Sequence, residues 1–167
     1  MYAIWLIPEK KDKNYLSKIV NQLSLQYNSP KFIPHITVYG LVKINLEIIQ
    51  NAILKSIKEI SPFTVKTDGL GYSDSIWKSL YISIRKNSNL ALINSKLSYS
   101  LSQFSDFSFD PHISLIYKKF PVAEKQKLIN SIKIKNEIKI YSIGILKFYK
   151  NVNSWKIIES FIFNNQN

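Results

Sequence analysis

Two copies of a short motif, Phe-x-Pro-His-Ile followed by Thr or Ser, constrain this sequence more than any other feature. The first copy spans residues 32–37 and the second spans residues 109–114. Both histidines of the 167-residue chain lie in these copies, and each copy follows a segment with helical periodicity. An internal repeat of this kind indicates two similar β-α-β halves related by an approximate two-fold axis.

The alternation of side chains along a strand gives each copy one chemical face. Residues two apart in a strand point the same way, so His35 lies beside Thr37 and His112 lies beside Ser114. The isoleucine between them points to the opposite face in both copies. If the two halves pair about the two-fold axis, two imidazoles and two hydroxyls converge on one site.

Such a site suits phosphodiester hydrolysis without a metal ion. One neutral imidazole can act as general base on water, while the other, protonated, acts as general acid on the leaving oxygen. Histidine suits both roles because its unperturbed pKa, about 6.5, lets the two protonation states coexist near neutral pH. Thr37 and Ser114 would hold the non-bridging phosphate oxygens, where charge must be stabilised.

The composition excludes several other kinds of site. The chain has no cysteine and two histidines, so it has no disulfide scaffold, thiolate zinc site, iron–sulfur cluster, cysteine nucleophile or three-histidine metal site. The 11 carboxylates form no paired acid–base arrangement in the sequence. We therefore expect neither a metal nor another cofactor.

Hydrophobic periodicity and turn residues predict eleven elements in the order β-α-β-α-β-β-α-β-α-β-β. This order favours an α+β fold over a doubly wound sheet. No segment has the composition of a flexible linker, so we expect one two-lobed domain over residues 1–167. The expected strands cover residues 2–7, 31–39, 63–71, 76–85, 111–117, 136–149 and 154–163, and the expected helices cover residues 12–28, 45–59, 88–103 and 121–131.

A net charge of +12 invites a nucleic-acid interpretation. However, Arg85 is the only arginine. Lysine lacks the planar guanidinium that makes two hydrogen bonds at once to a phosphate or a base. We interpret the charge mainly as a solvated lysine surface that steers anionic substrates.

The first residues lack the basic region and the long apolar run of a signal peptide. No apolar stretch approaches the ~20 residues that span a bilayer. We expect a monomer in the cytoplasm, or in the host cytoplasm if the gene is viral, with no membrane partner.

The two copies, His35-Ile36-Thr37-Val38 and His112-Ile113-Ser114-Leu115, resemble the His-x-[Thr/Ser]-x motifs of the 2H phosphoesterase (LigT-like) superfamily. Residues 4–8, 30–35 and 111–117 and the closing segment with Trp155 are most similar to the plant and yeast cyclic phosphodiesterases.

The resemblance implies a bilobal α+β fold in which two antiparallel sheets line a central cleft and the helices lie outside. It also implies metal-independent hydrolysis of 2′,3′-cyclic nucleotides or ADP-ribose 1″,2″-cyclic phosphate to phosphomonoesters. By the same resemblance His35, Thr37, His112 and Ser114 are the catalytic set, and Tyr117 contacts the substrate.

The aromatic residues have two interpretations each. Strict alternation puts Tyr117 on the face opposite His112, so it reaches the cleft only if its strand ends or twists there. Trp5 and Trp77 either stack on a nucleobase or pack in the core. For Trp155 we favour core packing.

Two alternative functions stay open. The same chemistry could act on RNA ends that bear a 2′,3′-cyclic phosphate or on cyclic oligonucleotide signals. A domain of a different class, without catalytic activity, would bind nucleic acid through lysines and aromatic side chains. The first partner we expect is a small cyclic-phosphate nucleotide.

Overall fold

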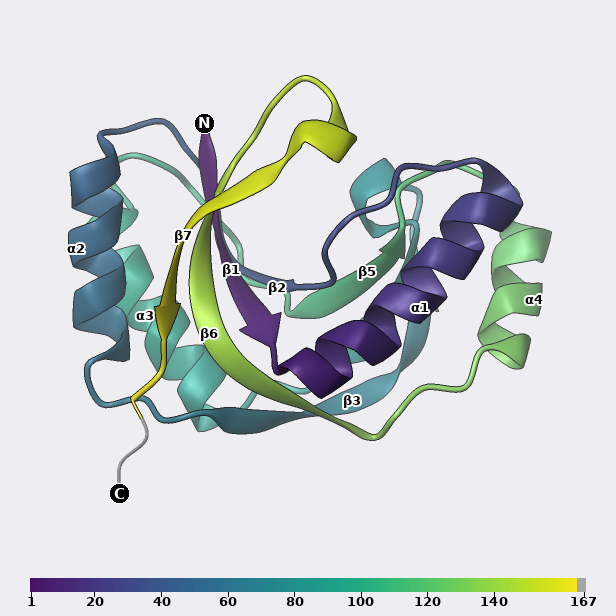
Figure 1. The fold of residues 1–167 in the computed structure, drawn as a ribbon, viewed down its shortest axis with the longest axis horizontal. Helices are drawn as coiled ribbons and strands as arrows, with labels where there is room; N and C mark the ends of the chain where they lie inside the picture. The colour runs from purple at the N-terminus through teal and green to yellow at the C-terminus, as the bar shows by residue number, and fades with distance from the viewer. Residues whose placement is uncertain (165–167) are drawn as a thin grey trace.

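The structure is a computed structural model that describes residues 1–164. The predicted order of strands and helices is confirmed (Figure 1). The strands are β1 (Tyr2–Pro8), β2 (Ile36–Val42), β3 (Phe63–Tyr72), β4 (Leu80–Ile84), β5 (His112–Ile116), β6 (Glu137–Lys147) and β7 (Lys156–Ile162). The helices are α1 (Lys10–Tyr27), α2 (Leu46–Ile57), α3 (Ser88–Leu101) and α4 (Val122–Ser131), with short 3-10 helices η1 (Ile76–Lys78) and η2 (Val152–Ser154).

Two strands begin four or five residues later than the sequence patterns predict. β2 begins at Ile36 rather than at residue 31, because Pro34 has no backbone N–H to donate to a ladder. The strand predicted from residue 76 is preceded by η1, where the Ser75 hydroxyl accepts a hydrogen bond from the Trp77 N–H. This local cap turns residues 76–78 into a helical turn that projects beside the sheet.

All strand pairs are antiparallel, and their order is β1-β2-β5-β4-β3-β6-β7. β6 also pairs with β1, so the strands from β1 to β6 form a closed hydrogen-bonded circuit. Ile140 of β6 is opposite Pro8 of β1 and Phe63 of β3. The predicted fold class is confirmed, and β6 belongs to both halves of the sheet.

The helices repeat the two-fold relation of the strands. α1 follows β1 and packs on β5, whereas α3 follows β4 and packs on β2. Figure 1 shows α1 and α4 on one side of the strands and α2 and α3 on the other. The buried side chains of α1 include Leu16, Val20 and Leu23, which belong to the stripe predicted from the sequence. The helices therefore cover the outer faces of the sheet and leave the cleft between its halves open.

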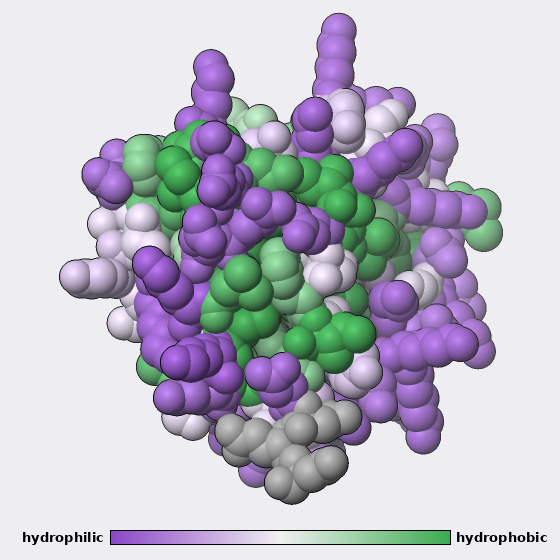
Figure 2. Space-filling model, turned by 60° about the vertical axis from the view of Figure 1, so that its left-hand side comes forward, coloured by the Kyte–Doolittle hydropathy of each residue, from purple (hydrophilic) through white to green (hydrophobic). Residues whose placement is uncertain are grey.

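The outer surface mixes polar and apolar side chains. Figure 2 brings the α2 side forward and shows apolar side chains framed by hydrophilic ones. α2 and β7 contribute exposed apolar residues, namely Ile48, Leu54, Ile158 and Ile162. No helix within residues 1–164 combines the length and the apolar character needed to cross a membrane.

Candidate active site

The two copies of the motif meet at a single pair of strand residues. Ile36 of β2 is opposite Ile113 of β5 in an antiparallel pair, and both side chains are buried in the core. In an antiparallel pair the neighbours of these residues face each other across the strands. His35 therefore comes next to Ser114, and Thr37 comes next to His112, on the face away from the core.

These four side chains lie in a cleft of about 590 Å³. The lining includes all seven residues singled out from the sequence, together with aromatic and charged residues that the sequence patterns did not indicate. The predicted lining residues are Trp5, His35, Thr37, Trp77, His112, Ser114 and Tyr117.

His35 is held in place by its own backbone and by an indole ring. Its Nδ1 lies 2.6 Å from the carbonyl oxygen of Ile33, and the ring stacks on Trp5 with centroids 3.3 Å apart and planes 10° apart. Since a carbonyl oxygen only accepts, Nδ1 carries the proton and Nε2 is the basic nitrogen of the neutral ring. Burial lowers the pKa of His35 to about 3.

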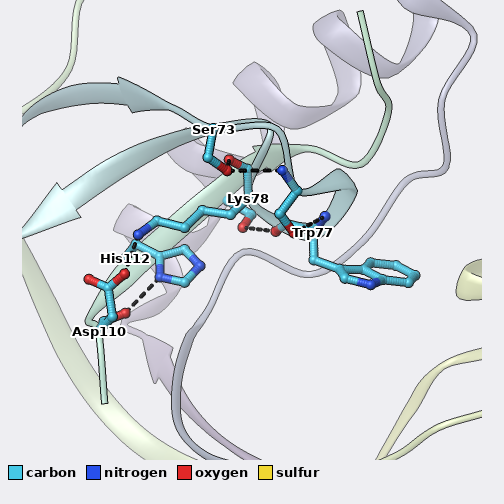
Figure 3. A network of polar contacts seen from close by, with 7 residues as sticks. Ser73, Trp77, Lys78, Asp110 and His112 are labelled. Carbon is cyan, nitrogen blue, oxygen red and sulfur yellow. Dashed lines mark hydrogen bonds and ion pairs between the residues drawn. The ribbon is translucent and has the colours of Figure 1, made fainter. Parts of the chain in front are cut away.

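His112 has the same arrangement in the second copy of the motif. Its Nδ1 lies 2.7 Å from the carbonyl oxygen of Asp110, so its Nε2 is also the basic nitrogen (Figure 3). The ring lies at 69° to that of Tyr81, with centroids 5.6 Å apart. Burial lowers the pKa of His112 as well, and the charge of Lys78 adds to this effect.

The two hydroxyl residues differ in their partners. The Ser114 hydroxyl donates a 2.7 Å hydrogen bond to the backbone carbonyl of Trp77. This bond joins β5 to η1, which carries an aromatic side chain into the cleft. Thr37 is opposite Trp5 in the β1–β2 ladder and lines the cleft beside His112.

Three aromatic side chains form one wall of the cleft. Trp77 lies with its ring centroid 5.4 Å from that of Tyr117 and 5.5 Å from that of Trp155. Tyr117 reaches the cleft because β5 ends at Ile116, which is the condition that strict alternation required. The core packing favoured for Trp155 is only part of its role, because this half-buried residue packs against the small core cluster around Trp5 and also lines the cleft.

Trp5 and Trp77 occupy different positions. Trp77 is 50% exposed, so its ring is available to a ligand. Trp5 lines the cleft but is only 2% exposed, and its ring is stacked on His35. The structure thus gives Trp5 the packing role that the sequence left open, directly beneath an imidazole of the candidate site.

Sequence reasoning missed an ion pair in the cleft. The ammonium of Lys78 contacts the carboxylate of Asp110, and both residues line the cleft. Asp110 stands at the variable position of the second Phe-x-Pro-His motif, where the first copy has Ile33. That difference between the copies is the one signal in the sequence that could have pointed to the pair.

The donor groups of the site are few. Within residues 1–164, no three His, Cys, Asp or Glu side chains lie close enough together to hold a metal ion. The polar groups around the two motifs in the cleft include two imidazoles, the Thr37 and Ser114 hydroxyls and one lysine–carboxylate pair.

An antiparallel α+β fold with two His-x-[Thr/Ser] units facing one cleft defines the class of 2H phosphoesterases, a group of phosphodiester hydrolases. The chain belongs to the cyclic phosphodiesterase-like protein family, whose model matches residues 1–165. Membership in this family identifies the protein as a phosphodiesterase enzyme.

Individual relatives are distant. The chain is 16% identical to the cyclic phosphodiesterase of Arabidopsis thaliana over 126 residues, which cover 75% of this chain and 70% of the relative. Its fold is similar to that of TT0787 of Thermus thermophilus, with a TM-score of 0.70, 14% identity and 99% of both chains covered. It is also similar to that of E. coli LigT complexed with 3′-AMP, with a TM-score of 0.65, 11% identity and 98% of both chains covered.

Proposed function

We propose that the protein is a metal-independent cyclic phosphodiesterase that hydrolyses 2′,3′-cyclic nucleotides or ADP-ribose 1″,2″-cyclic phosphate to phosphomonoesters. The observation that carries the proposal is the meeting of the two motifs at the Ile36–Ile113 pair. It sets two imidazoles beside two hydroxyls, with both Nδ1 atoms bonded to the backbone and both Nε2 atoms left for proton transfer.

The reaction uses one imidazole in each protonation state. The neutral ring takes a proton from water through Nε2, and the water oxygen attacks phosphorus. The protonated ring gives its Nε2 proton to the ribose oxygen as the phosphorus–oxygen bond breaks, and each transfer contributes about 10²–10⁴-fold to the rate. Thr37 and the Ser114 hydroxyl, turned away from the Trp77 carbonyl, donate to the non-bridging oxygens.

The nucleoside lies against the aromatic wall. Trp77 offers an exposed indole face beside Tyr117, and stacking on such a face holds any nucleobase. Solved structures of E. coli LigT, which has the same fold, are described as complexes with 3′-AMP, NADP+ and ATP. Those complexes support a small nucleotide as the ligand of this cleft.

Turnover of 2′,3′-cyclic AMP in EDTA tests the proposal. The parent protein should hydrolyse the substrate, whereas His35→Ala and His112→Ala should each lose activity by about 10²-fold or more, since each removes one proton transfer. Chromatography that separates 2′-AMP from 3′-AMP identifies the ester bond that breaks. A requirement for added Mg²⁺ or Zn²⁺ would contradict the mechanism.

A second substrate class is favoured by the length of the cleft. Beyond Thr37 the lining continues along β2 to Gly40 and Leu41, with Phe107 opposite. The Trp77 carbonyl bonds to Ser114, whereas Gly40 and Leu41 lie further along β2 than Thr37, so a cyclic mononucleotide with its base on Trp77 would leave this end empty. An oligonucleotide with a terminal 2′,3′-cyclic phosphate would fill both ends, and its kcat/KM compared with that of 2′,3′-cyclic AMP distinguishes the two classes.

A further inference from the structure

The two imidazoles of the cleft supply little positive charge for an anionic substrate. A phosphodiester is an anion, and its hydrolysis to a monoester adds further negative charge. Both imidazoles are buried, which lowers the pKa of His35 and of His112 and favours their neutral forms. Within the part of the chain that the structure describes, Lys78 is the one lysine or arginine in the cleft lining.

The backbone of η1 fixes the direction of the Lys78 side chain. The Lys78 N–H donates to the carbonyl of Ser75 at 3.1 Å, and the Lys78 carbonyl accepts a 2.7 Å hydrogen bond from the Ser73 hydroxyl. The ammonium lies over the ring of Tyr81, 4.2 Å from its centroid. Figure 3 shows the side chain extending past the ring of His112 toward Asp110.

The partner of Lys78 can be exchanged at low cost. The Asp110 side chain is 67% exposed, and an ion pair with a solvated partner contributes little stability. Asp110 also orients His112, and it does so without the ion pair to Lys78, because the imidazole bonds to the Asp110 backbone carbonyl and not to its carboxylate. A phosphate that enters beside His112 thus competes with one exposed carboxylate for the ammonium.

We propose that Lys78 is a phosphate-binding residue of this cleft, which releases the Asp110 carboxylate when an anionic substrate binds. The inference rests on the proposed function and names the group that supplies the missing charge. Lysine acts as a point charge on phosphate, so its contribution holds for any nucleobase and grows as the product gains charge.

Two lysine variants with the same loss of charge test the proposal. Lys78→Met removes the ammonium from the cleft and keeps the length of the side chain. Lys55→Met is the matched control, because Lys55 is exposed on α2 and lies outside the cleft lining. With 2′,3′-cyclic AMP, Lys78→Met should raise KM by about 10- to 100-fold, as expected for a lost charged hydrogen bond, whereas Lys55→Met should change KM by less than about twofold.

A third variant tests the exchange itself. Asp110→Asn frees the ammonium and leaves the backbone carbonyl that bonds to His112, so affinity for 3′-AMP, followed by tryptophan fluorescence, should increase several-fold. Equal KM values for Lys78→Met and Lys55→Met in an active enzyme would overturn the inference and leave the proposed function intact. Weaker binding by Asp110→Asn would overturn the exchange, and a parent protein that neither binds 3′-AMP nor turns over a cyclic phosphate would overturn both proposals.

Discussion

At the scale of single residues, the site depends on how each imidazole is held. The backbone carbonyl two residues earlier accepts from Nδ1 in both copies of the motif. This arrangement is a consequence of the Pro-His order in the sequence, since proline keeps the preceding residue extended and leaves its carbonyl facing the ring. The same tautomer in both rings leaves two equivalent Nε2 atoms, so burial and neighbouring charges decide their protonation.

The lowered pKa values predict an acidic pH optimum. In the proposed mechanism the active form carries one proton on the pair of imidazoles, and it is most populated between the two apparent pKa values. Burial lowers the pKa of His35 to about 3 and lowers that of His112 below its usual 6.5. The bell-shaped kcat/KM profile should therefore peak below pH 6.5.

Bound phosphate changes this profile in a defined direction. A nearby anion favours the charged imidazolium and raises its pKa, so the kcat profile should peak at higher pH than the kcat/KM profile. Initial rates from pH 4 to 9 at low and at saturating 2′,3′-cyclic AMP measure both curves. A kcat/KM optimum at or above pH 7 would contradict the effect of burial.

The same burial predicts how stability depends on pH. An unfolded histidine gains its proton near pH 6.5, whereas folded His35 stays neutral until about pH 3. Lowering the pH between these values therefore favours the unfolded state, by about 1.4 kcal/mol per pH unit for one such group. Urea unfolding at pH 6.5, 5.5 and 4.5 should show this loss in the parent and a smaller slope in His35→Gln, and equal slopes would be evidence against it.

The residues of the cleft could be predicted where a motif repeats in the sequence. They could not be predicted where the fold alone brings them to the cleft. His35, Thr37, His112 and Ser114 could be predicted to share one cleft because the motif occurs twice. Lys78 was not found, because it is one of 23 basic residues and reaches His112 only through the β4–β5 pairing, in which Ser83 is opposite His112.

At the scale of elements, the segment that carries Trp77 and Lys78 is anchored from outside the cleft. Lys125 of α4 is only 3% exposed, and its ammonium donates a 2.8 Å hydrogen bond to the carbonyl of Ser73. Ser73 in turn bonds to the Lys78 carbonyl. Replacing a lysine buried in this way by an apolar residue of similar size changes the stability of the protein little. The lysine nevertheless fixes the position of η1.

Replacing this anchor should change substrate binding more than chemistry. Lys125→Met should raise KM for 2′,3′-cyclic AMP by about three- to tenfold with kcat within about twofold, in line with the loss of one charged hydrogen bond. Lys127→Met is the matched control, since the Lys127 side chain on the same helix is 73% exposed. In a Trp77→Ala background the effect of Lys125→Met should shrink, because coupled residues are not additive, and full additivity would show that Lys125 does not act through η1.

The elements themselves were largely predictable, and their contacts were not. Apolar periodicity located all four helices and seven strands. The place of Trp155 in the cleft wall could not be predicted, because it depends on the η2 turn, in which the indole N–H bonds to the Tyr149 carbonyl at 2.9 Å. That turn brings the ring against Trp5 and Trp77, a contact between segments far apart in the sequence that periodicity does not encode.

At the scale of the whole molecule, the two halves share both a strand and the residues of the site. β6 pairs with β1 of one half and with β3 of the other. The Ile36–Ile113 pair closes the circuit of strands at the point where the two motifs meet. Separating the halves would break this circuit and take apart the candidate site, since each half supplies one imidazole and one hydroxyl.

This sharing predicts a single unfolding transition for the whole chain. The three tryptophans line the cleft and come from β1, η1 and the turn before β7, so tryptophan fluorescence reports on contact between the halves. Far-UV circular dichroism reports mainly on the four helices outside the sheet. Because no half buries its core without the other, the two signals should have the same urea midpoint, as expected for two-state unfolding. Ile113→Ala, which should cost about 2–5 kcal/mol in a buried site, should shift both midpoints equally, and a fluorescence change that precedes the loss of helix would show that the halves separate before they unfold.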